Sequence, residues 1–284
     1  MNPELAHALD TVGELPPVPQ IARKVMDAVG DPETSADDLR SIIEFDPTLA
    51  ARILRIANSS LYGFRREVET LRHAITLLGF RNVECTVMAA SLKEVFAHFG
   101  LGEKLLWEHA TLCGVVAAKL ASYGAIDTPR EPAFTAGLLH DLGKVALSNT
   151  FRERYARVMS RTYGEGVAYC EAEREEFGFD HALLGAHIAE SWNLPEALVT
   201  AIRRHHDPVT MYAELPPEQM RLVALTAITT RVCTRLGFGR RGPVEAVDLC
   251  AHDAWQALGL GEEDEEPILE LAQEEAKQAA GLFG

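Results

Sequence analysis

An adjacent histidine and aspartate, His140 and Asp141, are the residues in this sequence that most directly suggest chemistry. An imidazole nitrogen and a carboxylate oxygen are both good ligands for divalent transition metals. On one helix their side chains point about 100° apart, yet both reach an ion that lies beside the helix wall. Lys144 follows one turn after His140 and offers a cation for a phosphate group. This stretch makes His140 and Asp141 candidate metal ligands and Lys144 a candidate catalytic residue, although a His-Asp pair alone occurs by chance in many chains.

Four further histidines extend the pattern, although each has an ordinary structural explanation by itself. His109 shares an apolar helix face with Cys113, where a lone histidine is usually a satisfied core residue. His181 starts a helix, and the tandem His205 and His206 ends one, where the helix dipole favours a positive charge. The joint order His, His-Asp, His, His-His is much less expected by chance. It predicts that His109, His181, one of His205 or His206, and the His-Asp pair converge on one metal-binding pocket.

Helical periodicity dominates the chain and must supply the elements that position these residues. Apolar residues recur with a period of about 3.6, and strand-like alternation is hard to find, so we predict an all-α fold. Ser35 with Asp38, and Asp46 with Pro47, are signals for helix starts, and Asn58 is a signal for a helix end. Further helices are expected over residues 82–96, 105–123, 133–147, 152–163, 166–177, 181–192, 196–206 and 218–236.

Glycines divide the chain into three expected parts. Gly100 and Gly102 mark one boundary, and the glycine-rich residues 237–243 mark a second. We therefore predict an N-terminal helical subdomain over residues 1–99 and a second helical subdomain, which carries the histidines, over 100–237. The remaining residues, 238–284, are expected to form a C-terminal helical extension.

The charge balance limits the classes of partner. The 284 residues include 27 basic and 42 acidic ones, for a formal net charge of −15. Binding to nucleic-acid phosphates needs clustered Lys and Arg, so this excess of acid argues against a nucleic-acid partner. It argues more weakly against docking on an anionic membrane. A small anionic ligand is not disfavoured, because the acidic residues concentrate on helix faces away from the histidines.

Other features indicate a cytoplasmic protein. The first ten residues carry Glu4 and Asp10 and lack the apolar core of a signal peptide. The most apolar window, residues 105–125, is interrupted by charged and polar side chains and is a poor membrane span. The five cysteines show no CxxC spacing, so we expect scattered reduced thiols rather than disulfides or a thiolate metal site.

The order of the histidines resembles the HD superfamily of metal-dependent phosphohydrolases, and especially its HD-GYP branch, which hydrolyses cyclic di-GMP. The resemblance implies metal ligands at His109, His140, Asp141, His181 and the tandem His205 and His206, with Lys144 matching the lysine of the family's HDxGK stretch. Hydrolysis would then use a metal-activated water.

Two departures from that pattern argue against activity. The family's closing aspartate is expected within residues 222–232, and this stretch holds no carboxylate. Nothing after Asp207 and Pro208 resembles Gly-Tyr-Pro. An aspartate within residues 222–232 would help to balance the charge of two divalent ions, whereas the threonines and alanines of that stretch would not.

The N-terminal half indicates a subfamily. Several segments strongly resemble the HDOD domain, and the resemblance spans about residues 15–236. These segments are residues 15–19, 46–59, 74–79, 107–109, 137–144 and 192–195, ahead of the tandem His205 and His206. The resemblance implies an HD-like helical core with an N-terminal helical bundle, and a role in bacterial signalling and gene regulation, generally without demonstrated hydrolysis.

Two functions follow as expectations. The first is a regulatory protein in which a non-catalytic HD-derived core serves as a scaffold or ligand-binding module, with protein partners in a signalling pathway and a cyclic nucleotide or phosphate as the ligand. The alternative is a metal-dependent phosphohydrolase that acts on a cyclic dinucleotide or another phosphoester. A third, intermediate possibility is a protein that binds a metal ion for structure or sensing. Imidazole and carboxylate ligands suit Fe, Mn, Ni or Zn.

Overall fold

The protein is described by a computed structural model over residues 3–12, 20–58, 67–80, 82–84, 86–87 and 101–279. Within these residues the regular elements are helices and no strand occurs, which confirms the predicted all-α fold. The proline-rich residues 15–19 and most of the predicted helix 82–96 lie outside the described residues. By contacts the chain divides into two compact units: unit 1 holds residues 1–15 and 99–270, and unit 2 holds residues 16–98 and 271–284. The expected division into three domains stays a prediction.

Unit 2 shows the local signals that the sequence contained. Its described helices are α2 (Gln20–Gly30), α3 (Ala36–Ile43), α4 (Pro47–Ala57) and α5 (Leu71–Leu78). The predicted capping box is present, because the Ser35 hydroxyl accepts the Asp38 backbone N–H and the Asp38 carboxylate accepts that of Ser35. Asn58 ends α4, and its side-chain amide also bonds both backbone groups of Val68 at 2.9 and 2.7 Å. These hydrogen bonds fix where each helix starts and stops.

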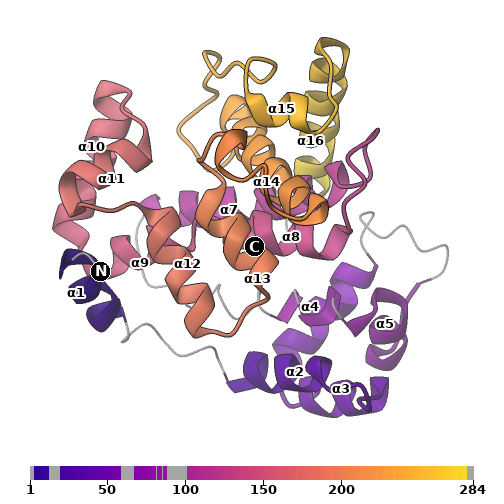
Figure 1. Ribbon diagram of the computed structural model, residues 1–284. Coiled ribbons are helices and arrows are strands. Elements are labelled where there is room, and N and C mark those ends of the chain that lie inside the picture. The colour runs from indigo at the N-terminus through magenta and orange to yellow at the C-terminus, as the bar shows by residue number, and fades with distance from the viewer. Residues whose placement is uncertain are drawn as a thin grey trace. The chain divides into compact units, whose positions relative to one another are not determined.

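Unit 1 carries the predicted site, and Figure 1 labels its helices. They are α1 (Pro3–Val12), α7 (Leu101–Leu120), α8 (Arg130–Leu139), α9 (Leu142–Thr150), α10 (Arg152–Glu165), α11 (Tyr169–Phe177), α12 (His181–Ser191), α13 (Glu196–Arg204), α14 (Pro217–Leu236) and α15 (Asp253–Ala257), with 3₁₀ turns at Val209–Met211 and Glu262–Asp264. The last helix, α16 (Glu265–Ala279), begins in unit 1 and ends in unit 2.

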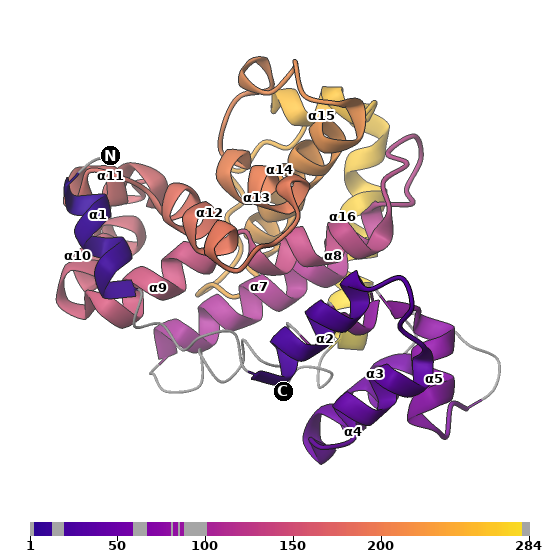
Figure 2. The same ribbon diagram turned by 60° about the horizontal axis from the view of Figure 1, so that its bottom comes forward.

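Helices α7 and α8 lie side by side at the centre of unit 1 and make its most extensive helix contact (Figure 2). Helix α14 packs on both, and α12 packs on α9 and α13. The α7–α8 contact is close because Gly137 has no side chain: a Cβ there would lie 2.5 Å from the carbonyl oxygen of Cys113. Helices that pack on several sides have little polar surface, which explains the buried runs along α7, α8 and α14.

A break separates α8 from α9, where the sequence predicted one continuous helix over residues 133–147, and that prediction is wrong. Helix α8 ends at Leu139, α9 starts at Leu142, and Asp141 has φ −97° and ψ 13°, outside the helical region. The physical reason lies in the packing of α9. A Cβ on Gly143 would overlap the carbonyl group of His181, so α9 meets α12 backbone to backbone, on an axis of its own.

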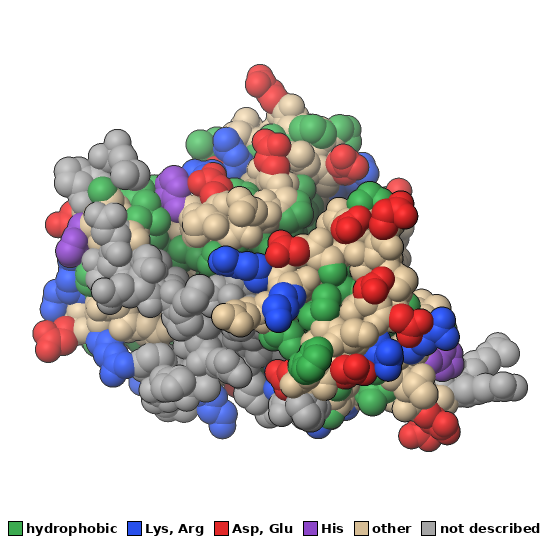
Figure 3. All heavy atoms as spheres, turned by 90° about the horizontal axis from the view of Figure 1, so that it is seen from below, with side chains coloured by type: hydrophobic (Ala, Val, Ile, Leu, Met, Phe, Trp, Pro, Cys, Tyr) green, Lys and Arg blue, Asp and Glu red, His purple; other side chains and the backbone are tan. Residues whose placement is uncertain are grey.

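Charged side chains of both signs are interspersed on the face of the molecule seen in Figure 3. Among the described residues, a search for a helix with the length and apolarity of a membrane span finds none. The described cysteines, Cys113, Cys170, Cys233 and Cys250, are free thiols, in line with the expected reduced state; Cys85 lies outside the described residues.

Replacing Gly143 by alanine should destabilise the protein by roughly 1–3 kcal/mol, because the new methyl group would push α9 away from α12. Gly164→Ala in α10 is the matched control: a Cβ at Gly164 meets nothing within 4 Å. The control should change stability by less than about 1 kcal/mol, in the stabilising direction. Urea unfolding of both variants measures this, and a Gly143→Ala protein as stable as the parent would show that the close approach is unimportant.

Candidate metal centre

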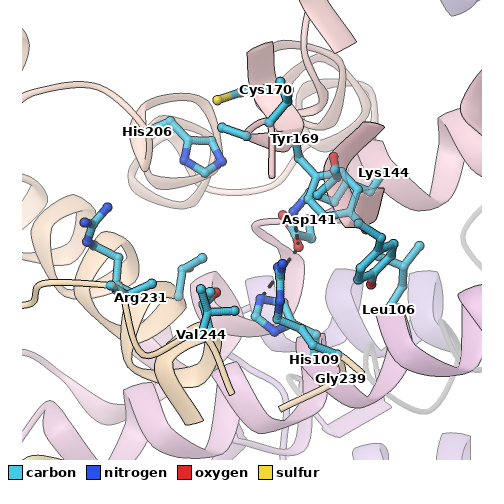
Figure 4. A pocket seen from close by; sticks show the side chains of 18 of the residues that line it. Leu106, His109, Asp141, Lys144, Tyr169, Cys170, His206, Arg231, Gly239 and Val244 are labelled. Carbon is cyan, nitrogen blue, oxygen red and sulfur yellow. Dashed lines mark hydrogen bonds and ion pairs between the residues drawn. The ribbon is translucent and has the colours of Figure 1, made fainter. Parts of the chain in front are cut away.

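The structure brings all of the predicted site residues in unit 1 together. His109 comes from the middle of α7, His140 and Asp141 from the break between α8 and α9, and His181 from the first residue of α12. His205 and His206 follow directly after α13. Figure 4 shows His109, Asp141, Lys144 and His206 around one pocket. Their convergence is a feature of the fold, whereas their individual roles as ligands stay predictions.

The carboxylate of Asp141 lies at the centre of the cluster and is buried. Its Oδ1 atom is 3.4 Å from Nε2 of His140 and 3.3 Å from Nε2 of His181. Its Oδ2 atom is 2.8 Å from the Lys144 ammonium and 3.8 Å from Nε2 of His109. The His140 and His205 rings meet edge to face, with centroids 5.1 Å apart. One carboxylate is therefore surrounded by imidazoles from four elements.

Four of the histidines are oriented in the same way, with Nδ1 tied to the surrounding protein. The partners of Nδ1 are the carbonyl of Phe238 for His109 (2.9 Å), of Gly137 for His140 (2.7 Å), of Ile202 for His205 (2.7 Å), and the Glu173 carboxylate for His181 (2.5 Å). Since a carbonyl oxygen only accepts hydrogen bonds, Nδ1 carries the proton and Nε2 of a neutral ring holds a free lone pair. This outer support is the usual arrangement of metal-binding histidines.

Three buried atoms in the cluster have no hydrogen-bond partner among the described residues: Nε2 of His140, Oδ1 of Asp141 and Nε2 of His205. These residues offer ligand atoms that all lie within 4.8 Å of one another. Buried acceptors without a hydrogen bond are rare and costly, and one cation bound by all three would satisfy them together. The donor set therefore fits a transition-metal ion.

Two neighbouring groups extend the cluster. His206 keeps exposed surface, and its Nε2 lies 3.0 Å from Nε2 of His181, so one of the two rings must donate to the other. On the opposite side, the thiol of Cys113 lies 3.5 Å from Nε2 of His109. In the sequence Cys113 was identified only as an apolar neighbour of His109, although its spacing of four residues from that histidine was a usable signal.

The charges of the cluster are set by their neighbours. Burial by itself would raise the pKa of Asp141, but His140 and Lys144 hold that pKa well below its usual range. Burial would also lower the pKa of His181, yet the adjacent Glu173 outweighs it and raises the pKa to about 9. Burial, with His140 and His181 nearby, lowers the pKa of His205 well below its usual range. At neutral pH the centre thus holds an ionised Asp141, a protonated His181 and a neutral His205.

Glu173 belongs to the cluster through its hydrogen bonds to His181, and the sequence did not single it out. It is fully buried in α11 and accepts hydrogen bonds from the Tyr155 hydroxyl (3.0 Å), the His181 backbone N–H (2.8 Å) and the His181 ring. In the sequence it stands among acidic residues that are typical of a solvated helix face. The available signal was that Glu173 lies four residues before Phe177 and so shares its buried face.

Lys144 is engaged within the centre. Its buried ammonium bonds Oδ2 of Asp141 at 2.8 Å and lies over the ring of Tyr169, 4.5 Å from the ring centroid. The sequence predicted that Lys144 lies one turn after His140 on the same helix. Because the helix breaks before α9, Lys144 instead lies one turn after Asp141 on a separate helix. Its catalytic role stays a prediction, while its structural partner is the aspartate.

A pocket of about 650 Å³ opens beside the cluster. Residues of α10, α11 and the link between them form one wall, and α14 with the loop after it forms another. The positions that α14 contributes are Ala227, Thr230, Arg231 and Thr234, so no carboxylate of α14 lines the pocket. The lack of a carboxylate in residues 222–232, already noted in the sequence, therefore applies at the site itself.

Comparison with known proteins places the chain in a family. Residues 15–208 match the HDOD domain. A solved HDOD domain protein of unknown function from Geobacter sulfurreducens is 27% identical and aligns with a TM-score of 0.76, over 98% of this chain and 97% of that one. A candidate phosphohydrolase from Shewanella amazonensis is 23% identical, with a TM-score of 0.65 over 98% of this chain and 92% of that one.

Two further relatives are similar at the same level of identity. A candidate signal transduction protein from Marinobacter aquaeolei is 24% identical, with a TM-score of 0.71 over 97% of this chain and 61% of that one. An uncharacterized protein of Treponema pallidum is 24% identical over 202 residues, or 71% of this chain, and the match spans 39% of that relative's length.

An all-helical unit that directs histidines and one aspartate from several helices to a buried point defines an HD-like domain. Since the HDOD match covers more than half of the chain, the chain belongs to the HDOD family, as the sequence resemblance indicated.

Substituting Glu173 by glutamine should flatten the pH dependence of stability in the metal-free protein. The pKa of His181 lies near 9 in the fold and near 6.5 when unfolded, so its contribution is complete below pH 6.5 and is lost as the pH rises through 9. The raised pKa bounds this loss at about 3 kcal/mol. Urea unfolding between pH 6.5 and 9 should show the loss in the parent protein and a smaller one in Glu173→Gln.

Glu171→Gln, on an exposed position of the same helix, is the matched control and should follow the parent profile. If Glu173→Gln and the parent lose stability in parallel over this pH range, the His181–Glu173 pair does not carry the effect.

Proposed function

We propose that this chain is a regulatory module of bacterial signal transduction whose HD-like core binds one divalent transition-metal ion and does not turn over a substrate. The observation that carries the proposal is a set of three buried atoms, on His140, Asp141 and His205, that have no hydrogen-bond partner among the described residues. Their outer partners already hold the rings in the orientation that metal binding needs. His109, His181 and His206 lie beside these three residues and are candidates for additional metal ligands.

Charge supports one ion rather than two. Two divalent ions bring four positive charges, and Asp141 is the one carboxylate that lines the pocket among the described residues. Its second oxygen is already bound by Lys144, so the ammonium occupies the side of the carboxylate where a second ion would bind. Because α14 offers threonine, alanine and arginine there, nothing on that helix compensates for a second ion.

A bound ion would supply Lewis acidity and a binding point for an anionic ligand. Imidazole and carboxylate donors suit Fe, Mn, Ni and Zn, and the donor set does not select among them. We further propose a cytoplasmic location, which the free state of the described cysteines supports, and protein partners in a signalling pathway. The Marinobacter relative named for signal transduction supports the regulatory role by analogy.

A second candidate function is a metal-dependent phosphohydrolase that acts on a cyclic dinucleotide or another phosphoester. The observation in its favour is the pocket of about 650 Å³ that directly adjoins the His/Asp cluster, with Lys144 in its lining. Turnover of bis(p-nitrophenyl) phosphate or cyclic di-GMP by metal-loaded protein, abolished in His140→Ala, would favour this candidate over the regulatory module.

Protein prepared without a histidine tag and supplied with Fe, Mn, Ni or Zn should retain about one equivalent of metal per chain. His205→Gln and Asp141→Asn should each lower retention at least about tenfold, because each removes a ligand atom. Metal analysis by mass spectrometry measures this. His187→Ala in α12, a partly exposed histidine paired with Glu190, is the matched control and should keep the parent's metal. Retention below about a tenth of an equivalent by the parent protein would sink the proposal.

Lys144→Met should destabilise the metal-free protein by about 3–5 kcal/mol, because it leaves the buried Asp141 carboxylate without its cation. Metal should restore much of that loss, since an ion also neutralises the carboxylate. Thermal unfolding with and without metal measures both effects. A Lys144→Met protein that loses the same stability in both states would contradict the assigned charge balance.

A further inference from the structure

Three arginines line the pocket without an acidic partner. Arg231, Arg240 and Arg241 form no ion pair with a carboxylate among the described residues, although acidic residues outnumber basic ones by 42 to 27 in the chain. Asp248 and Asp253 affect Arg231 through longer-range electrostatics. Eight other arginines pair with carboxylates; these are Arg40, Arg72, Arg154, Arg157, Arg161, Arg174, Arg203 and Arg204. Others, such as Arg221 and Arg235, form no ion pair among the described residues either, so what distinguishes the three is that they lie together at one pocket. In so acidic a chain, unpaired cations around one pocket need an explanation.

The loop that carries two of these arginines is attached to the metal centre. The carbonyl of Phe238 holds Nδ1 of His109 at 2.9 Å. The next residue, Gly239, has φ 64° and lies so close to α7 that a Cβ would overlap backbone atoms of Leu105 and His109. Arg240 and Arg241 follow directly. The same short segment thus orients a candidate ligand histidine and places two guanidinium groups at the pocket.

Aromatic rings orient these cations without neutralising them. The guanidinium carbons of Arg240 and Arg241 lie 5.7 and 5.1 Å from the ring centroid of Tyr163. Tyr163 meets Tyr169 edge to face, and Tyr169 lies beneath the Lys144 ammonium. A ring face attracts a cation but leaves its full charge and most of its N–H donors available. The arginines are therefore positioned and still able to bind an anion.

Arg231 approaches from a different element. It extends from α14 on the side of the pocket opposite Lys144 and Asp141 (Figure 4). Its Nη2 atom donates to the Asp248 carbonyl at 3.3 Å, and its Nε atom is buried without a hydrogen-bond partner among the described residues. The pocket is thus lined by guanidinium groups from two elements, with the metal centre beside them.

The number of charges indicates the ligand. Four cations and one carboxylate line the pocket, and Lys144 neutralises that carboxylate, so three positive charges remain. A monocarboxylate would leave most of this charge unbalanced, whereas a phosphomonoester carries about two negative charges at neutral pH. A volume of about 650 Å³ suits a small molecule. The chain's net charge of −15 opposes a long polyanion.

We propose that Arg231, Arg240 and Arg241 form the recognition wall for a small phosphorylated molecule with at least two negative charges, bound beside the metal centre. This inference rests on the proposed regulatory function and specifies its ligand class. All three arginines lie beyond residue 208 and are therefore outside the residues that match the HDOD domain.

The test uses phenyl phosphate as the probe and benzoate as its singly charged counterpart, titrated calorimetrically into the full-length protein with and without metal. Phenyl phosphate should bind and benzoate should bind at least about tenfold more weakly, because charge-assisted hydrogen bonds to arginine scale with ligand charge. Arg231→Gln and the double change Arg240→Gln with Arg241→Gln should each weaken phenyl phosphate binding at least about tenfold. Arg157→Gln, which removes a surface arginine paired with Glu176, should leave it unchanged.

Three outcomes would overturn the inference: no phenyl phosphate binding at about 5 mM, equal affinity for benzoate, or binding that is unchanged in the arginine variants. Tighter, arginine-dependent binding of a hexaglutamate peptide would assign the wall to an acidic protein partner instead. Metal content measured on the same samples separates this inference from the proposed function. Protein that retains metal but does not bind phenyl phosphate refutes the ligand alone. Protein that binds phenyl phosphate through the arginines but retains none of the supplied metal refutes the metal centre alone.

Discussion

The buried carboxylate of Asp141 is the constraint on which the centre depends. A charge removed from water costs several kcal/mol unless it is neutralised and hydrogen bonded. Lys144 satisfies one oxygen, while the other faces imidazole nitrogens of His140 and His181. The same neutralisation limits the centre, because a carboxylate already bound by an ammonium has one oxygen left for a metal ion.

Other residues of unit 1 orient the candidate ligand histidines around that carboxylate. Backbone carbonyls of Phe238, Gly137 and Ile202 orient three histidines, and Glu173 orients a fourth. The contact of Gly143 with the first turn of α12 brings the two sides of the cluster together. A pre-oriented set of this kind loses little conformational entropy when an ion binds, which supports a binding centre even where the carboxylate of a second metal is missing.

Much of the fold and of the candidate site could be predicted from the sequence, wherever the cause is a local interaction along the chain. Ser35 and Asp38 define a helix start through hydrogen bonds three residues apart, and the apolar period defines the helices. The candidate ligands could be chosen from residue type and order. The break at Asp141 and the role of Glu173 could not, because both arise from contacts with α12, a helix that packs against them only in the folded chain.

The sequence by itself determined the all-helical class through its periodicity, the six candidate ligands through residue type and order, and the HDOD family through the resemblance of several segments to that domain. Only the tertiary structure decided that Lys144 binds Asp141, that three candidate ligand atoms have no hydrogen-bond partner among the described residues, and that Arg231 and Arg241 line the same pocket as Asp141 and His205. The physical reason is that a buried charge or hydrogen-bond donor takes its partner from whatever the packing brings within about 3 Å, at any separation along the chain.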